Sequence, residues 1–119
     1  MTDSAGETPL SAEDAKLVTL ARATRARVGA AEGAAVRDTD GRTYAAATVD
    51  LPSLRLSALQ VCVAMALASG SRGLEAAVVL TEAETLAADD LAAVTDLGGG
   101  GVVVHRGDAR GTLAQSTTT

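Results

Sequence analysis

The sequence lacks the bulky aromatic side chains that usually fill a protein core. Among its 119 residues there is no phenylalanine and no tryptophan, and Tyr44 is the single tyrosine. Because 47% of the chain is nevertheless apolar, alanine, valine and leucine must form the core, which favours closely packed layers. The length corresponds to one domain. We place it at residues 11–113, with flexible, polar ends at 1–10 and 114–119.

Cysteine and histidine are almost absent as well. Cys62 is the one cysteine and His105 the one histidine. A single cysteine excludes an intramolecular disulfide and fits a reducing compartment. Because Cys62 lies in an apolar run, we expect a buried side chain and not a reactive thiol, and we expect His105 at the surface.

Two classes of partner are excluded by what is missing. The net charge is −5, and the basic residues between 16 and 27 have Glu13 and Asp14 beside them, so nucleic acid is not an expected partner. The uncharged run at 56–71 is too short to span a membrane. The N-terminus "MTDSAGETPL" has neither the basic nor the apolar part of a secretory signal. We therefore expect a cytoplasmic protein that binds neither membranes nor nucleic acid.

The hydrophobic periodicity predicts alternating helices and strands. Ser11 begins the first helix with a cap, and Asp40-Gly41 joins two strands in a hairpin. The run "LEAAVVLT" is typical of a strand buried on both faces. We predict a helix from 11 to 28, strands at 33–38 and 42–49, a helix at 57–69, a strand at 74–81, a helix at 85–98 and a strand at 102–105. This order predicts an α/β fold: a three-layer α/β/α sandwich whose small mixed sheet combines a β-hairpin with parallel strands and carries helices on both faces.

The stretch "ARVGAAEGAAVRDTDGRTYAAATVDLPSLRLSALQVCVAMALASG" resembles the central block of the cytidine deaminase family. In that family an initial helix is followed by a Val-Gly-Ala-Ala strand, an Asp-Gly hairpin and a helix that begins Cys-Ala-Glu or His-Ala-Glu. The likeness covers roughly residues 12–106, through the order of elements and the matches "GAAV", "DG", "TVD" and "SA". It implies a cytidine deaminase-like fold.

The resemblance also implies a catalytic site of three zinc ligands and a proton-carrying glutamate. On that pattern Ser57 occupies the first ligand position and Leu59 replaces the glutamate. The segment "TEAETLAADD" (81–90) stands where the family has Pro-Cys-x-x-Cys, and it contains no cysteine or histidine. We do not expect Cys62 and His105 to meet. We therefore expect a pseudoenzyme: no catalytic residues, no zinc or other cofactor, and no enzymatic activity.

A remnant of the ligand pocket is still expected. The resemblance matches Thr48 and Asp50 to the sugar-binding Asn and Glu of the family, and we group them with Ser57 and Glu82 as the ligand-binding candidates. The leading hypothesis is a catalytically inactive oligomer that acts as an interaction or regulatory scaffold. One alternative is a module that binds a nucleoside or another small molecule without turnover. A third is an enzyme: either a hydrolase of the family with a non-standard site, or an enzyme of different chemistry that uses Ser57 as its nucleophile.

The helix predicted at 57–69 is apolar on every side, whereas a sheet can cover only one side of it. The resemblance implies that a neighbouring subunit covers the rest. We therefore expect a homo-oligomer, a dimer or a tetramer, that associates through residues 57–68. An unidentified protein partner is the alternative.

Overall fold

The computed structural model describes residues 10–119, so the flexible end predicted at 1–10 falls, except for its last residue, outside the described residues. Within these residues three helices and seven strands follow one another. In order they are α1 (Ala12–Val28), β1 (Gly33–Asp38), β2 (Thr43–Ala47), β3 (Val49–Leu51), β4 (Leu54–Leu56), α2 (Ala58–Ala68), β5 (Leu74–Leu80), α3 (Ala88–Gly98), β6 (Val103–Gly107) and β7 (Leu113–Thr118).

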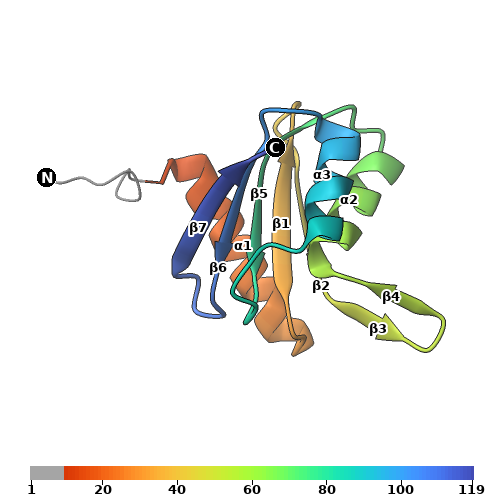
Figure 1. Cartoon of the computed structure of the whole chain (residues 1–119), viewed down its shortest axis with the longest axis vertical. Helices are drawn as coiled ribbons and strands as arrows, with labels where there is room; N and C mark the ends of the chain where they lie inside the picture. The colour runs from red at the N-terminus through yellow and green to blue at the C-terminus, as the bar shows by residue number, and fades with distance from the viewer. Residues whose placement is uncertain (1–9) are drawn as a thin grey trace, which may run out of the picture.

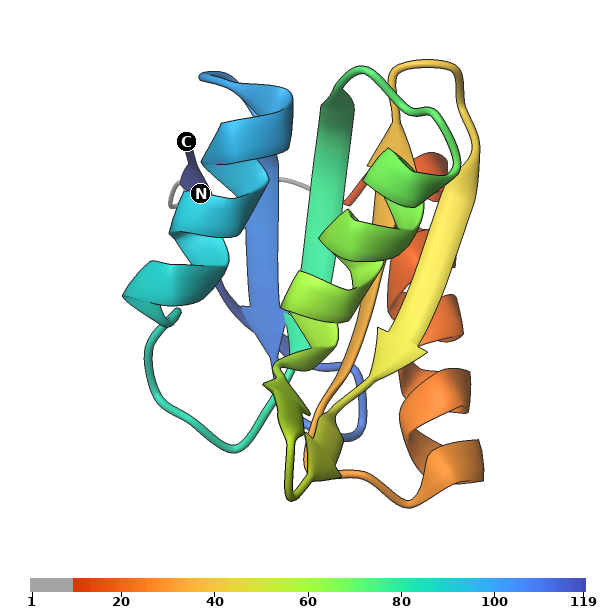
Figure 2. The same cartoon turned by 90° about the vertical axis from the view of Figure 1, so that its right-hand side faces the viewer.

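Five of the strands form the middle layer, in the order β2-β1-β5-β6-β7. β5 and β6 run parallel and every other neighbouring pair is antiparallel. Figure 1 shows α1 on one side of this sheet and α2 and α3 on the other, and Figure 2 shows the α2 and α3 side. The predicted α/β/α sandwich with a small mixed sheet is thereby confirmed. No helix within residues 10–119 combines the length and the apolar character that a membrane span needs.

The α1 layer is held by a cap and by small side chains. Ser11 caps the helix, since its Oγ accepts a hydrogen bond from the Asp14 backbone N–H at 3.0 Å. Gly33 lets the helix lie close to β1, because a Cβ at this position would collide with the Ala21 carbonyl. The core on this face is made of Leu17, Ala21, Ala35, Ala76, Val78 and Leu80.

The layer of α2 and α3 buries the larger part of the core. Leu59, Cys62 and Ala66 of α2 are fully buried against the sheet, and Val94 of α3 packs into the same cluster. Because helices lie on both faces, β5 is buried almost throughout, as its uninterrupted apolar run indicates. The outer side of α2 stays exposed, with Leu67 at 62%.

A buried carboxylate organises the β1–β2 hairpin. Asp38 is fully buried and accepts hydrogen bonds from Ser71 Oγ at 2.5 Å and from Tyr44 Oη at 3.1 Å. It also accepts the backbone N–H groups of Asp40 and Arg42, each at 2.9 Å. Burial opposes ionisation, but these four donors outweigh it and lower the pKa of Asp38. The carboxylate thus fixes the turn that the Asp-Gly pair predicts.

The C-terminal segment differs from the prediction. Residues 114–119 were expected to be a flexible end, but Leu113–Thr118 form β7, antiparallel to β6. The segment is polar because one face of an edge strand is open to water, and polarity alone does not distinguish such a strand from a frayed end. The backbone hydrogen bond from Thr119 N–H to the Val102 carbonyl (2.9 Å) extends the pairing to the last residue.

Two further boundaries differ. The strand predicted at 42–49 ends at Ala47. A second hairpin, formed by β3 and β4 with Pro52 and Ser53 in its turn, follows it and projects from the sandwich (Figure 1). The third helix begins at Ala88 with Ala87 at the N-cap position, three residues after the start predicted at Thr85. Alanine has no side-chain acceptor, so this helix start carries no sequence signal.

Candidate functional site

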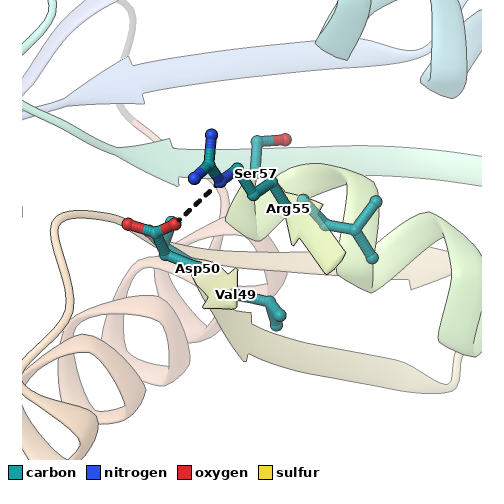
Figure 3. Close-up of a pocket in the computed structure, with 6 residues that line it drawn as sticks. Val49, Asp50, Arg55 and Ser57 are labelled. Atoms are coloured by element: carbon teal, nitrogen blue, oxygen red, sulfur yellow. Dashed lines mark ion pairs between the residues drawn. The ribbon is translucent and has the colours of Figure 1, made fainter. Parts of the chain in front are cut away.

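The main candidate site is a pocket of about 550 Å³ where the β3–β4 hairpin leads into α2. Figure 3 shows its lining side chains. Polar groups come from β3, β4 and the start of α2, while apolar ones line the wall between them. The lining residues are Thr48, Val49, Asp50, Arg55, Leu56 and Ser57.

An ion pair lies across the hairpin at the edge of this pocket. Asp50 and Arg55 are directly opposite each other in the β3–β4 register, and the Arg55 Nε to Asp50 Oδ1 distance is 3.3 Å (Figure 3). Both side chains are more than three-quarters exposed. Since water screens an exposed pair, it contributes little to folding, and both charged groups are accessible to a ligand.

Thr48 anchors the pocket to the segment between α1 and β1. Its Oγ1 accepts the Glu32 backbone N–H at 2.9 Å, and the Thr48 N–H donates to the Glu32 carbonyl at 3.2 Å. The side chain is therefore held in one position. Glu32 lies close enough to Asp90 to raise its pKa, which places a third segment of the chain beside the pocket.

Ser57 both caps α2 and contacts α3. Its Oγ accepts the Gln60 backbone N–H at 3.1 Å, and Gln60 Oε1 accepts the Ser57 N–H at 3.0 Å, which makes a capping box. The Ser57 Oγ also lies 2.5 Å from Asp90 Oδ1, in the first turn of α3. The hydroxyl donates to the carboxylate and so joins the two helix starts.

Asp90 is held in a setting that favours its protonated form. The side chain is buried, with 4% exposed. Burial raises the pKa of Asp90, the hydrogen bond from Ser57 lowers it in part, and the nearby negative charges of Glu32 and Asp89 raise it further. The site therefore contains a carboxyl group that retains its proton to higher pH than an exposed aspartate.

The structure brings together three of the four predicted ligand-binding residues. Thr48, Asp50 and Ser57 line one pocket. Glu82 does not join them: it is exposed in the loop after β5 and is not among the lining residues. Asp90 was not among the predicted site residues, because its contact with Ser57 depends on how α2 and α3 pack.

The other residues considered in the sequence, Leu59, Cys62 and His105, do not line the pocket. Leu59, at the expected glutamate position, is fully buried in the core. Burial raises the pKa of the Cys62 thiol to about 12, so it is unreactive as predicted. His105 was expected at the surface but is 6% exposed and lies on the α1 face, away from the pocket.

Comparison with known proteins agrees with this architecture. A family model described as "Cytidine deaminase-like" matches residues 10–111. The chain belongs to the cytidine deaminase-like family. No curated protein matches the sequence of this family member.

Solved structures of cytidine deaminases are similar in fold. The cytidine deaminase from Burkholderia pseudomallei superposes with a TM-score of 0.77 at 21% identity, covering 92% of this chain and 93% of that one. The enzyme from Mycobacterium leprae gives 0.71 at 18% identity, covering 91% and 94%. The enzyme from Mycobacterium tuberculosis gives 0.67 at 20% identity, covering 79% and 85%.

One expectation from the sequence is contradicted by these findings. We expected a chain that is not an enzyme, but the solved structures that match it are cytidine deaminases, which are enzymes, and the family model is of the same kind. We therefore do not retain that expectation.

The zinc that the resemblance implies does not fit the residues at this site. Ser57 and Asp90 supply one hydroxyl and one carboxylate, whereas catalytic zinc ordinarily takes three protein ligands of cysteine, histidine or carboxylate type. Nowhere in residues 10–119 are three cysteine, histidine or carboxylate side chains grouped as a metal ion would require. The residues at this site therefore do not form a catalytic zinc site.

Proposed function

We propose that this cytidine deaminase-like protein binds a nucleoside or a similar polar small molecule in the pocket between the β3–β4 hairpin and the start of α2. The single observation that carries the proposal is the convergence of Thr48, Asp50 and Ser57 on one pocket of about 550 Å³. That volume lies within the range of small-molecule sites, which combine an apolar wall with a few placed polar groups.

The polar groups of the pocket suit a sugar. The exposed Asp50 carboxylate is an acceptor for the neighbouring hydroxyls of a ribose, and the Arg55 guanidinium supplies donors for its oxygens. Thr48, fixed by the Glu32 backbone, holds one wall in place before a ligand arrives. A site that is ordered in advance loses less entropy on binding.

The test is calorimetric titration of the full chain with cytidine and uridine in buffer that contains EDTA. We expect binding by the wild type, at least about tenfold weaker binding by Asp50→Asn, and unchanged binding by Glu82→Gln. The Glu82→Gln variant is the matched control, because Glu82 lies outside the pocket. Release of ammonia, measured in the same samples, distinguishes turnover from binding alone. Absence of nucleoside binding at millimolar concentration, or equal affinity of wild type and Asp50→Asn, would overturn the proposal.

We also propose that the protein is a homo-oligomer, a dimer or a tetramer, that associates through residues 57–68. The outer side of α2 supports this, since Val61 and Met65 are only partly buried and Leu67 is 62% exposed. Leu51 and Leu54 of the projecting hairpin add two half-exposed apolar side chains. We further propose that the protein is cytoplasmic, because its single cysteine fits a reducing compartment.

A further inference from the structure

A second cluster of reactive side chains lies on the opposite face of the sheet, beneath α1. His105 of β6 and Ser116 of β7 face each other in the strand register, and His105 Nδ1 lies 2.6 Å from Ser116 Oγ. The other ring nitrogen, Nε2, lies 2.9 Å from Asp14 Oδ2 of α1. A serine hydroxyl, an imidazole and a carboxylate therefore form one continuous hydrogen-bonded chain, although 102 positions separate the serine from the aspartate in the sequence.

The carboxylate in this chain is ionised and fixed. Arg37 Nη2 lies 2.9 Å from Asp14 Oδ1, and Arg37 Nε lies 2.8 Å from Glu75 Oε1. Burial opposes ionisation of Asp14, but the hydrogen bonds from His105 and Arg37 outweigh burial and lower its pKa. Asp14 thus accepts hydrogen bonds through both of its oxygens.

The ionised carboxylate determines the tautomer of the histidine. In the neutral ring only one nitrogen carries a proton, and the nitrogen that faces Asp14 must donate. Nε2 therefore carries the proton, and Nδ1 is left to accept the hydroxyl proton of Ser116. The imidazole is oriented as a general base toward the serine. The order serine, imidazole, carboxylate is that of Ser-His-Asp catalytic triads, but the two ring nitrogens have exchanged roles: here Nδ1 faces the serine and Nε2 faces the carboxylate.

The serine is the accessible member of the three. His105 and Asp14 are buried, whereas Ser116 is exposed. It lies on β7, the last strand of the sheet within residues 10–119 (Figure 1). Thr119 N–H bonds to Val102, and bonded and non-bonded pairs alternate in an antiparallel ladder, so the Ser116 N–H points away from β6. This backbone donor, beside the hydroxyl, is free to stabilise an oxyanion.

We propose that Ser116, His105 and Asp14 form a second reactive site, in which Ser116 is an acyl-accepting nucleophile toward small activated esters. Ser116 and His105 are the catalytic residues of this site, and Asp14 is a positioning residue that acts through His105.

The proposed reaction is an acyl transfer in two steps. Ser116 Oγ attacks the ester carbonyl carbon as its proton passes to His105 Nδ1; the bond to the leaving alcohol then breaks, and the alcohol departs with that proton. Water attacks the resulting serine ester and gives a proton to His105. The acid is released, and the proton returns to Ser116 Oγ.

The test uses the full chain, an alkyl fluorophosphonate probe and p-nitrophenyl acetate. We expect one phosphonyl group per chain, located on Ser116 by peptide mapping, with loss of fluoride. We expect Ser116→Ala to abolish labelling and to lower the rate of nitrophenol release by about 100-fold, the lower end of what a positioned general base contributes. Thr118→Ala is the matched control, because it removes an exposed hydroxyl two residues along the same strand.

Variants of the two buried residues, Asp14 and His105, test whether these residues activate Ser116. Asp14→Asn and His105→Gln are expected to lower kcat for the ester while leaving KM unchanged, with circular dichroism confirming the fold. If either buried variant fails to fold, Ser116→Cys replaces it: its thiol should react with iodoacetamide at least about tenfold faster than a free cysteine at pH 7, as expected for a thiol beside a base. Labelling at another residue, no labelling, or equal rates in wild type and Ser116→Ala would overturn the proposal.

Discussion

At the scale of single residues, Ser57 and Asp90 connect the first turns of two helices that are far apart in the sequence. The serine begins its own helix with a capping box and donates its hydroxyl to the buried aspartate at 2.5 Å. The Ser57 hydroxyl therefore forms hydrogen bonds both with a backbone N–H in the first turn of α2 and with a buried carboxyl group. Loss of the Ser57 hydroxyl should therefore lower the free energy of unfolding by more than loss of an ordinary helix cap does.

The substitution Ser57→Ala measures this double role. We expect it to lower the free energy of unfolding by about 1 kcal/mol for the cap and by a further 1 to 3 kcal/mol, roughly, for the buried carboxyl group left without its donor. Ser11→Ala is the matched control, because within residues 10–119 Ser11 caps α1 without a side-chain partner of this kind, and its loss should lower the free energy of unfolding by only about 1 kcal/mol. Urea denaturation gives both values. Equal losses in the two variants would show that the contact with Asp90 contributes nothing.

The pH dependence of stability should reveal the proton on Asp90. Its pKa is raised in the folded state by burial, and by Glu32 and Asp89, so its contribution to stability is present below the unfolded-state pKa. That contribution is lost as pH rises through the folded-state value. Asp90→Asn mimics the neutral form. It should therefore gain stability over wild type as pH rises from 4 to 8, whereas the exposed Glu82→Gln should not. Denaturant titrations across this range measure the free energy of unfolding of each protein. A difference between Asp90→Asn and wild type that is the same at every pH would contradict the raised pKa of Asp90.

The candidate site was predictable where its residues are close in sequence. Thr48, Asp50 and Ser57 lie within ten positions of one another, so a resemblance over that stretch was enough to group them, and the structure places them around one pocket. Asp90 could not be grouped with them, because its contact depends on how α2 and α3 pack. The contact between Asp14 and His105 could not be predicted for the same reason, since only the folded protein brings α1 and β6 together.

At the scale of elements, the apolar pattern was sufficient for the buried strands and insufficient for the edge of the sheet. β5 is a continuous apolar run because both of its faces are covered, and its prediction at 74–81 is confirmed. β7 has the sequence Leu-Ala-Gln-Ser-Thr-Thr and is mostly exposed. Its order comes from backbone pairing with β6, which leaves no mark on the side-chain pattern.

Hydrogen exchange of the amides tests whether β7 is a strand. The Thr119 N–H bonds to Val102, and bonded and non-bonded positions alternate from there. We therefore expect slow exchange at Thr117, whose N–H faces β6, and fast exchange at Ser116 and Thr118, whose N–H groups face away. Measurement by NMR gives the rate at each position. Uniformly fast exchange from 114 to 119 would restore the flexible end expected from the sequence.

At the scale of the whole molecule, the three layers follow from where the apolar side chains lie, but the layers do not cover every apolar surface. α2 has leucine, valine or alanine at nearly every position, and one helix can face the sheet with only part of its circumference. α3 packs beside it, yet Leu67 stays 62% exposed. The sequence predicted that this helix needs a further cover, and residues 10–119 of one chain do not supply it.

The mass in solution decides what covers α2. If a second copy does, the wild type should sediment as a dimer or a tetramer, and Leu67→Glu should give a smaller species, because a charge buried in an apolar interface without a partner is strongly unfavourable. Val28→Glu is the matched control: Val28 is 56% exposed at the end of α1, on the other side of the sheet. That variant should keep the wild-type mass. Sedimentation equilibrium at several protein concentrations measures all three proteins, and a monomeric wild type, or equal masses for wild type and Leu67→Glu, would show that α2 is not the interface.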